Sequence, residues 1–204
     1  MSNAGAFGVD LVRVEEAPPS LDTYIAAQGL VLGEAVPQSD ELTRDTLSMQ
    51  THTVLIARIQ RELSQIDTPY AETKKQLSVA KETGQNAYWM AVSLSLHAMY
   101  TGLEKIFEQI AQSVDGNLSK GQHWHKELLE QMSIEIKGVR TAVIDLQTLE
   151  SLKKYLAFRH VVRSNYAYRL EPERIENNFQ ILEDCYGSVV GQLNDFCEFL
   201  TSVG

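Results

Sequence analysis

The sequence has little cysteine and no long apolar run, and both absences exclude classes of protein. Only two cysteines occur among its 204 residues, without a Cys-x-x-Cys or Cys/His spacing, so we expect reduced thiols and no metal site. The longest apolar segment, residues 88–100, is too short to span a bilayer, and no signal-peptide pattern is present. These absences favour a cytoplasmic protein without a membrane partner.

Sequence signatures of the common catalytic sites are also missing. There is no Walker-type glycine loop, no Gly-x-Ser-x-Gly, no Asp-x-Asp metal pair and no His-Glu-x-x-His. We therefore expect no cofactor and neither a classical hydrolase nor a metalloenzyme. The net charge of −9 argues against a broad basic surface for nucleic acid, although a small cationic cleft is compatible with it.

What the sequence does contain is helical periodicity over residues 39–204. Apolar residues recur at spacings of three and four, which predicts helices over residues 43–66, 70–83, 85–113, 121–135, 148–170 and 172–201. Asp67, Thr68 and Pro69 predict a break between the first two, and residues 138–145 predict a loop. Short connections imply antiparallel neighbours, so we predict an all-α, up-and-down bundle of four to five helices.

Residues 1–38 differ from this pattern and are predicted to form a separate N-terminal arm. Residues 8–14 alternate apolar and polar side chains like a short strand, and Pro18 and Pro19 end the alternation. Ser20 can cap a short helix that Gly29 ends. One strand and one short helix cannot bury enough apolar surface to fold alone, so the arm should pack on a partner or belong to another domain.

Two arginines lie on what should be the core-facing stripe of the helix predicted over residues 148–170. At 100° per residue, Arg163 is about 40° from Arg159. Six apolar or aromatic residues lie within about 60° of Arg159: Leu152, Tyr155, Leu156, Val162, Tyr166 and Leu170. Because a buried unpaired charge is costly, the arginines either grip a phosphodiester or bind buried carboxylates that hold the helices in register.

Three further residues are candidates for the same site. Glu104 lies one turn after Tyr100, where the stripe formed by Met99 and Leu103 holds the helix over residues 85–113 against the core. It is therefore the expected counter-charge for the arginines. His160, next to Arg159, could act as a general acid or base because imidazole exchanges protons near neutral pH. His125 is expected either to line a cleft or to pack at a helix start.

Residues 158–166 and 170–174 resemble the fourth helix of HepT-like proteins, which belong to the HEPN superfamily of helical ribonuclease toxins. Residues 96–104, 120–132 and 138–140 are similar to the preceding parts of these proteins, in the same order, so the resemblance covers roughly residues 45–204. It implies a HEPN-type bundle and a metal-independent endoribonuclease. It also implies a homodimer in which two copies of the motif face one cleft.

The family motif is an arginine, four to six further residues, a histidine and often a tyrosine two positions later. Arg159 and Tyr166 match the arginine and the tyrosine, whereas Ser164 stands at the histidine position. Serine cannot exchange a proton near neutral pH as imidazole does, so the resemblance implies either an attenuated ribonuclease or a non-catalytic interaction module. The candidate catalytic residues are Arg159, His160, Arg163, Ser164 and Tyr166. The candidates for substrate binding are Glu104, His125, Arg140 and Arg169.

The N-terminal arm resembles the tail of a minimal nucleotidyltransferase, the usual antitoxin partner of HEPN toxins. Such an antitoxin can adenylylate the motif tyrosine, which here is Tyr166. Asp10 matches the third carboxylate of the transferase, but its Gly-Ser and paired-aspartate signature is absent, so residues 5–33 are interpreted as a remnant or truncated fusion. The expected partners are a second copy of the chain, a nucleotidyltransferase and RNA; a bundle that binds small nucleotides is the weaker alternative.

Overall fold

The computed structural model describes residues 38–161 and 171–203, which are mainly helical. Its elements in chain order are α2 (Gln38–Thr83), α3 (Asn86–Ile110), a π-helical turn η1 (Ala111–Asp115), α4 (Trp124–Met132), α5 (Leu146–Val161) and α6 (Pro172–Ser202). Over these residues no strand is present beyond an isolated bridge between Ile136 and Arg140, so the prediction of an all-α protein is confirmed. The strand and short helix expected before residue 38 lie outside the described residues.

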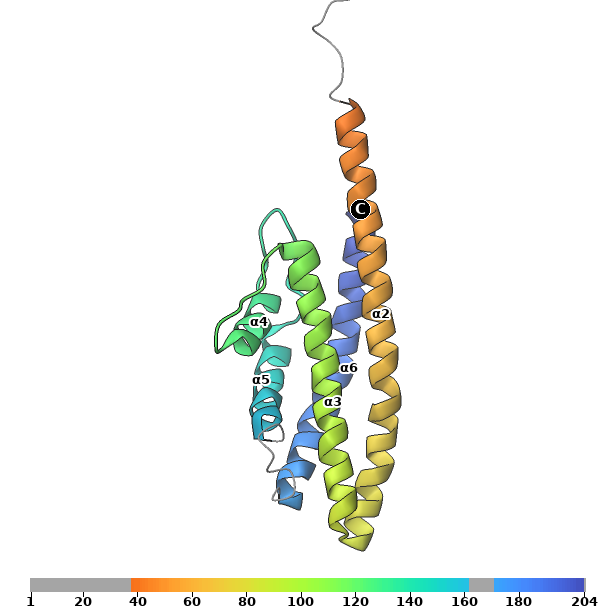
Figure 1. Ribbon diagram of the computed structural model, residues 1–204, viewed down its shortest axis with the longest axis vertical. Helices are drawn as coiled ribbons and strands as arrows, with labels where there is room; N and C mark the ends of the chain where they lie inside the picture. The colour runs from red at the N-terminus through yellow and green to blue at the C-terminus, as the bar shows by residue number, and fades with distance from the viewer. Residues whose placement is uncertain (1–37, 162–170, 204) are drawn as a thin grey trace, which may run out of the picture. The chain divides into compact units, whose positions relative to one another are not determined.

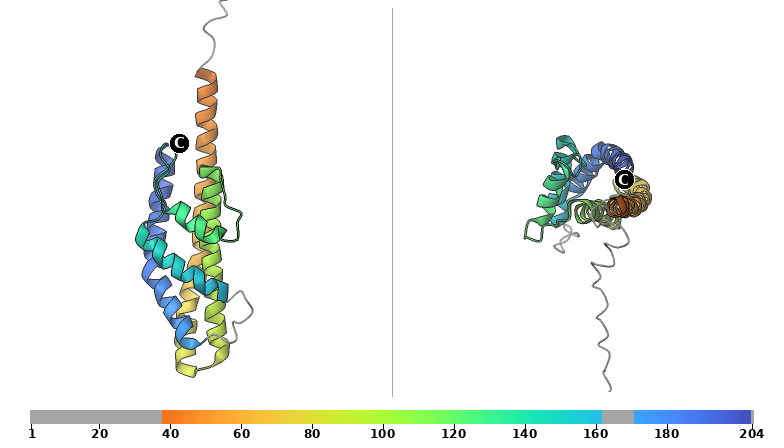
Figure 2. Two further views of the ribbon diagram at one scale, coloured as in Figure 1. Left: turned by 90° about the vertical axis from the view of Figure 1, so that its left-hand side faces the viewer. Right: turned by 90° about the horizontal axis from the view of Figure 1, so that it is seen from above.

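By its backbone contacts the chain divides into two units, Met1–Leu42 and Thr43–Gly204, and the helical bundle belongs to the second. Within this unit α2 runs along one side of α3 and α6, and α4 and α5 lie on the other side (Figures 1 and 2). α3 packs against α4, α5 and α6, and α5 packs against α6. Of the helices described, none is both long and apolar enough to cross a membrane.

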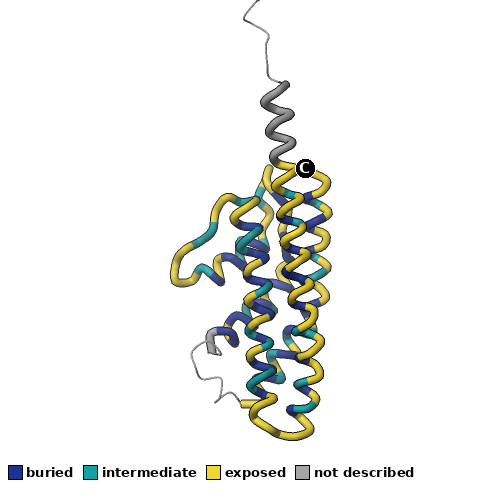
Figure 3. The backbone as a smooth tube through the Cα atoms, turned by 45° about the vertical axis from the view of Figure 1, so that its right-hand side comes forward, coloured by how far each residue is buried: buried dark blue, intermediate teal, exposed yellow. Residues whose placement is uncertain are grey.

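α3 lies at the centre of the bundle because its apolar residues keep to one face over its whole length. Seven of them are buried at spacings of three or four: Trp89, Val92, Leu96, Met99, Leu103, Ile106 and Ile110. Gly84, with φ of 64°, ends α2 in the left-handed conformation that glycine adopts without strain. Only Gln85 separates this turn from α3, so the two helices are antiparallel neighbours. Figure 3 shows buried and exposed positions alternating along the helices.

One prediction about α2 was wrong, because the helix does not end at Asp67. It continues through Pro69, although a proline inside a helix removes a backbone hydrogen bond and costs about 3 kcal/mol. Packing offsets this cost, since buried side chains continue on both sides of the proline: Leu63, Ile66, Thr73 and Leu77. The helix predicted over residues 70–83 is therefore the second half of α2.

The other helices differ from their predicted bounds mainly at the ends. α4 is shorter than residues 121–135 because the chain turns after Met132 and enters the bridge at Ile136. α5 begins two residues before the predicted start because the Asp145 carboxylate accepts the N–H of Thr148 at 2.7 Å, as an N-cap does. α6 begins at Pro172 as predicted, since proline suits the first turn of a helix. The expected continuation of α5 over residues 162–170 lies outside the described residues.

Both cysteines are buried in α6 and are free thiols. Burial raises the pKa of Cys185 to about 11 and also raises that of Cys197. Both groups are therefore protonated at neutral pH and are poor nucleophiles.

Candidate functional site

Three buried polar side chains meet where α3, α4 and α5 pack together. Glu104 comes from α3, His125 from α4 and Arg159 from α5, and their exposed fractions are 5%, 7% and 8%. Nη2 of Arg159 lies 2.9 Å from Oε2 of Glu104, and Nη1 lies 3.2 Å from Nε2 of His125. Nδ1 of His125 is hydrogen-bonded to Oε1 of Glu104. One carboxylate thus contacts both the guanidinium and the imidazole.

Helical periodicity explains why Arg159 reaches this position. Leu152, Tyr155 and Leu156, which share its stripe of α5, are all buried, so the expectation that Arg159 faces the core is confirmed. Glu104 lies beside the buried Leu103 in the apolar stripe of α3. The counter-charge expected for the arginine is therefore the carboxylate that contacts it.

The two contacts of His125 favour one of its tautomers. A guanidinium has only N–H donors, so Nε2 of His125 must accept the hydrogen bond from Nη1 of Arg159. Nδ1 then carries the proton and donates it to the carboxylate of Glu104. In this state the imidazole is neutral and its basic nitrogen is the one that faces the arginine.

Aromatic side chains give the cluster a surrounding of low polarity. The guanidinium carbon of Arg159 lies 5.7 Å from the centre of the Tyr100 ring, in a cation–π contact. Burial, together with the charge of Glu104, raises the pKa of Tyr100 above its ordinary value. Desolvation also raises the pKa of Glu108, against the opposing effect of Arg159. Charge interactions inside this region are consequently stronger than they would be in water.

The imidazole also borders a depression in the surface. This depression has a volume of about 350 Å³ and is lined by Gln122, His123, His125, Lys126 and Leu156. His125 belongs to the lining, whereas Glu104 and Arg159 do not. A ligand in the depression would therefore contact His125, and His125 in turn contacts Arg159.

Arg159 does not use all five of its N–H donors among the described residues. Its Nε is shielded from solvent and has no hydrogen-bond partner there. The other two nitrogens contact His125 and Glu104. Part of the hydrogen-bonding capacity of this arginine is therefore not taken up by the described residues.

Arg140, a candidate for substrate binding, is not part of this cluster. Its Nε and Nη2 bind the two carboxylate oxygens of Asp115 at 2.6 and 2.8 Å. The remaining three N–H groups donate to carbonyl oxygens at 3.0 Å: those of Gln131, Ile134 and Thr141. All five donors of the guanidinium are satisfied. Two of the acceptors, the carbonyls of Gln131 and Ile134, lie at the C-terminal end of α4, so the arginine caps this helix.

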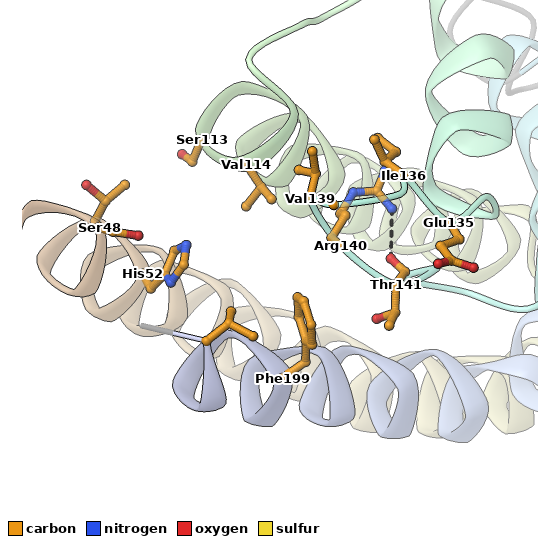
Figure 4. Close-up of a pocket in the computed structure, with 13 residues that line it drawn as sticks. Ser48, His52, Ser113, Val114, Glu135, Ile136, Val139, Arg140, Thr141 and Phe199 are labelled. Carbon is orange, nitrogen blue, oxygen red and sulfur yellow. Dashed lines mark hydrogen bonds between the residues drawn. The ribbon is translucent and has the colours of Figure 1, made fainter. Parts of the chain in front are cut away.

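The same arginine borders a separate depression of about 750 Å³ between α2, the end of α6 and the segment after α4 (Figure 4). His52, Val139, Thr141 and Phe199 are among the residues that line it. Figure 4 shows the hydrogen bond from Arg140 to the carbonyl of Thr141 at its wall. Because the guanidinium is saturated, it offers no donor to a ligand in this depression.

Several of the candidate residues lie outside the described residues: Arg163, Ser164, Tyr166 and Arg169, together with the side chain of His160. The structure therefore brings together three of the sequence-predicted residues, Glu104, His125 and Arg159, and places Arg140 elsewhere.

The main structural residue that the sequence did not reveal is Asp115. Its position before Gly116 is typical of the end of a helix, and nothing in the pattern connected it with Arg140. The carboxylate is buried, with 2% of its side chain exposed, and also accepts a hydrogen bond from Gln131 at 2.6 Å. Only the folded chain brings these segments together.

Across residues 38–161 and 171–203, no three histidine, cysteine, aspartate or glutamate side chains are grouped so that they could hold a metal ion. A family model described as HepT-like protein matches residues 91–200, which is more than half of the chain and includes all three members of the cluster. No curated protein and no solved structure matches the chain.

Proposed function

Because the chain belongs to the HepT-like proteins of the HEPN superfamily, we propose that it is the toxin component of a HEPN toxin–antitoxin system and cleaves RNA without a metal ion. The observation that supports this most is the contact between Arg159 and His125, which joins a phosphate-binding group to a group that exchanges protons. An enzyme that catalyses attack of the RNA 2′-hydroxyl on the neighbouring phosphate uses both kinds of group, one to stabilise charge on the phosphate and one to exchange protons.

Arg159 binds the scissile phosphodiester and stabilises the extra negative charge that develops on it. The 2′-oxygen attacks phosphorus, the bond from phosphorus to the 5′-oxygen breaks, and a 2′,3′-cyclic phosphate remains. A base takes the proton of the 2′-hydroxyl, and the leaving 5′-oxygen takes a proton from water. Before RNA binds, Glu104 supplies the negative charge that the guanidinium needs in a buried position.

His125 serves as the base in this proposal, since Ser164 stands at the histidine position of the family motif. Its Nδ1–H is held by Glu104, which leaves Nε2 as the basic nitrogen. When a phosphate draws Nη1 of Arg159 away, Nε2 is released to accept the proton. A carboxylate that orients an imidazole in this way also stabilises the imidazolium that forms.

Membership of the family also supports the proposals for partners and location. We propose a cytoplasmic homodimer in which two such sites face one cleft, and a nucleotidyltransferase antitoxin that modifies Tyr166. Size-exclusion chromatography with light scattering tests the dimer. Co-expression with the transferase encoded nearest to this chain, followed by mass spectrometry of Tyr166, tests the modification.

The direct test is RNA cleavage by the purified protein in EDTA, with the products analysed for 2′,3′-cyclic phosphate ends. We expect cleavage by the wild type and at least a roughly hundredfold loss in Arg159→Ala, since one charge-stabilising group commonly contributes that factor. Ser164→His, which restores the motif, is expected to cleave faster. The proposal is wrong if neither the wild type nor Ser164→His cleaves RNA.

A second candidate function is a non-catalytic dimer that binds a nucleotidyltransferase. The observation that favours it is Ser164, together with the ion pair that already occupies Nη2 of Arg159. It predicts a stable complex with the transferase and no cleavage by the wild type or by Ser164→His. Failure to recover that complex would exclude it.

A further inference from the structure

A third hollow, a cleft, lies between α5 and α6, which pack against each other (Figure 2). Its volume is about 460 Å³. α5 contributes Lys154, Ala157 and Phe158 to the lining, and α6 contributes Arg174, Asn177, Asn178 and Ile181. Phe158 immediately precedes Arg159 in α5, so this cleft is built on the same helix as the candidate site.

The charge of this cleft is opposite to that of the whole chain. The chain carries a net charge of −9, yet the described residues of the lining include Lys154 and Arg174 and no carboxylate. Within the described residues neither cation forms an ion pair, whereas the neighbouring Lys153 is paired with Glu130 and Glu150. Two exposed, unpaired cations on facing helices attract a ligand with more than one negative charge.

The rest of the lining suits a base rather than a simple anion. Ala157, Phe158 and Ile181 form an apolar wall. Asn178 donates its side-chain N–H to the carbonyl of Arg174 at 2.7 Å, while the exposed Asn177 makes no side-chain hydrogen bond within the described residues. An amide has both a donor and an acceptor, so Asn177 can pair with the edge of a base that lies against the apolar wall.

We propose that this cleft binds single-stranded RNA, with backbone phosphates on Lys154 and Arg174 and one base against the apolar wall beside Asn177. The choice of RNA as the ligand rests on the proposed function, but the binding can be measured without cleavage.

The test is fluorescence anisotropy with a short single-stranded RNA whose 2′-hydroxyls are methylated, so that it cannot be cleaved. The double variant Lys154→Ala/Arg174→Ala should bind about tenfold more weakly than wild type, and its salt dependence should fall because two phosphate contacts are lost. The matched control is Arg61→Ala/Lys137→Ala, which removes one arginine and one lysine that are exposed and unpaired elsewhere among the described residues. It should bind as wild type does.

Asn177→Asp provides a second variant that does not disturb folding, since it keeps the shape of an exposed side chain. A new carboxylate in the cleft should weaken RNA binding severalfold. The inference is overturned if wild type does not bind this RNA, or if the control variant loses as much RNA affinity as the double variant. It is also overturned if the cleft variants bind RNA as wild type does but bind a protein partner more weakly.

These outcomes separate the inference from the proposed function. RNA binding that depends on Lys154 and Arg174, without any cleavage of unmodified RNA, would support the cleft and reject the ribonuclease. Cleavage that depends on Arg159, with a KM that is unchanged in the double variant, would reject the cleft and leave the ribonuclease intact.

Discussion

Arg140 and Arg159 are both buried, both paired with a buried carboxylate and both anchored between helices, yet their guanidinium groups are used differently. Arg140 donates all five of its N–H groups, to Asp115 and to three backbone carbonyls. Arg159 contacts one carboxylate oxygen and an imidazole and keeps Nε unpaired among the described residues. Burial alone therefore does not distinguish an arginine that only stabilises the fold from a candidate for catalysis.

The partners of the two arginines make the distinction. Fixed backbone carbonyls cannot move away or exchange protons, so the contacts of Arg140 hold the end of α4 and can do little else. The imidazole of His125 can change its protonation state and can also accept a proton from another molecule. A buried arginine beside an imidazole, which exchanges protons near neutral pH, is hence a better candidate for chemistry than one held by a carboxylate and backbone carbonyls.

The largest effect is expected from Arg140→Ala. The substitution removes the counter-charge of the buried Asp115 carboxylate and one donor to each of three carbonyls, so the free energy of unfolding should fall by about 3–5 kcal/mol. Urea denaturation followed by circular dichroism measures it. Arg61→Ala, at an exposed position, should stay within about 0.5 kcal/mol of wild type. Equal stabilities for the two variants would remove the structural role assigned to Arg140.

The next effect is expected from His125→Asn. The amide nitrogen of asparagine can replace Nδ1 and keep the hydrogen bond to Glu104, while the basic Nε2 is lost. RNA cleavage should therefore fall about a hundredfold or more, and the pH dependence of the remaining rate should flatten. His125→Gln, which places its amide near Nε2, should be equally inactive. Unchanged cleavage in both variants would exclude His125 as the base.

Glu104→Gln sharpens the comparison by removing the negative charge beside Arg159. We expect the free energy of unfolding to fall by about 2 kcal/mol, because the buried Arg159 keeps its charge and a hydrogen-bonding partner but loses its counter-charge. RNA should bind more tightly, since no carboxylate competes for the guanidinium, while turnover should fall because the imidazole is less well oriented. Anisotropy and single-turnover cleavage separate the two effects. Weaker RNA binding would show that Glu104 does not compete with phosphate.

The smallest effect is expected from Asp145→Ala at the start of α5. Loss of the N-cap should lower the free energy of unfolding by about 1 kcal/mol without changing RNA cleavage well below the melting temperature. The backbone N–H of Thr148 lowers the pKa of Asp145, so its contribution is complete above the ordinary aspartate pKa and is lost as the pH falls through the lower folded value. Asp145→Asn should consequently show less acid-dependent loss than wild type. A change in cleavage would mean that the cap also positions Arg159.

The sequence predictions were correct for the helices whose own residues carry strong signals for their faces and ends. α3 has an uninterrupted apolar stripe between clear ends, and α6 begins at a proline, so both were predictable from their own residues. α2 was not, because Pro69 gives a local signal for a break that only the buried contacts on either side override. A prediction from local propensity is wrong where packing against distant segments contributes more to the stability of a helix than its own residues do.

The candidate site shows the same limit. Arg159 could be identified because a charge in an apolar stripe is conspicuous. Glu104 could be identified because Met99 and Leu103 hold its part of the helix against the core. Contact between His125 and Arg159 could not be derived, since it depends on how α4 lies across α5. The saturated state of Arg140 depends likewise on Asp115 and on three backbone carbonyls from other segments.

The distinction between the two arginines is tested most directly by comparing Arg140→Lys with Arg159→Lys in the same two assays, urea unfolding and RNA cleavage in EDTA. Lysine keeps the charge but lacks the planar fork of donors. Arg140→Lys should lose about 2 kcal/mol of stability and cleave RNA as wild type does while folded, whereas Arg159→Lys should lose at least about a hundredfold in cleavage at a smaller cost in stability. Equal losses of stability, with cleavage unaffected by Arg159→Lys, would contradict the assignment of the site to Arg159.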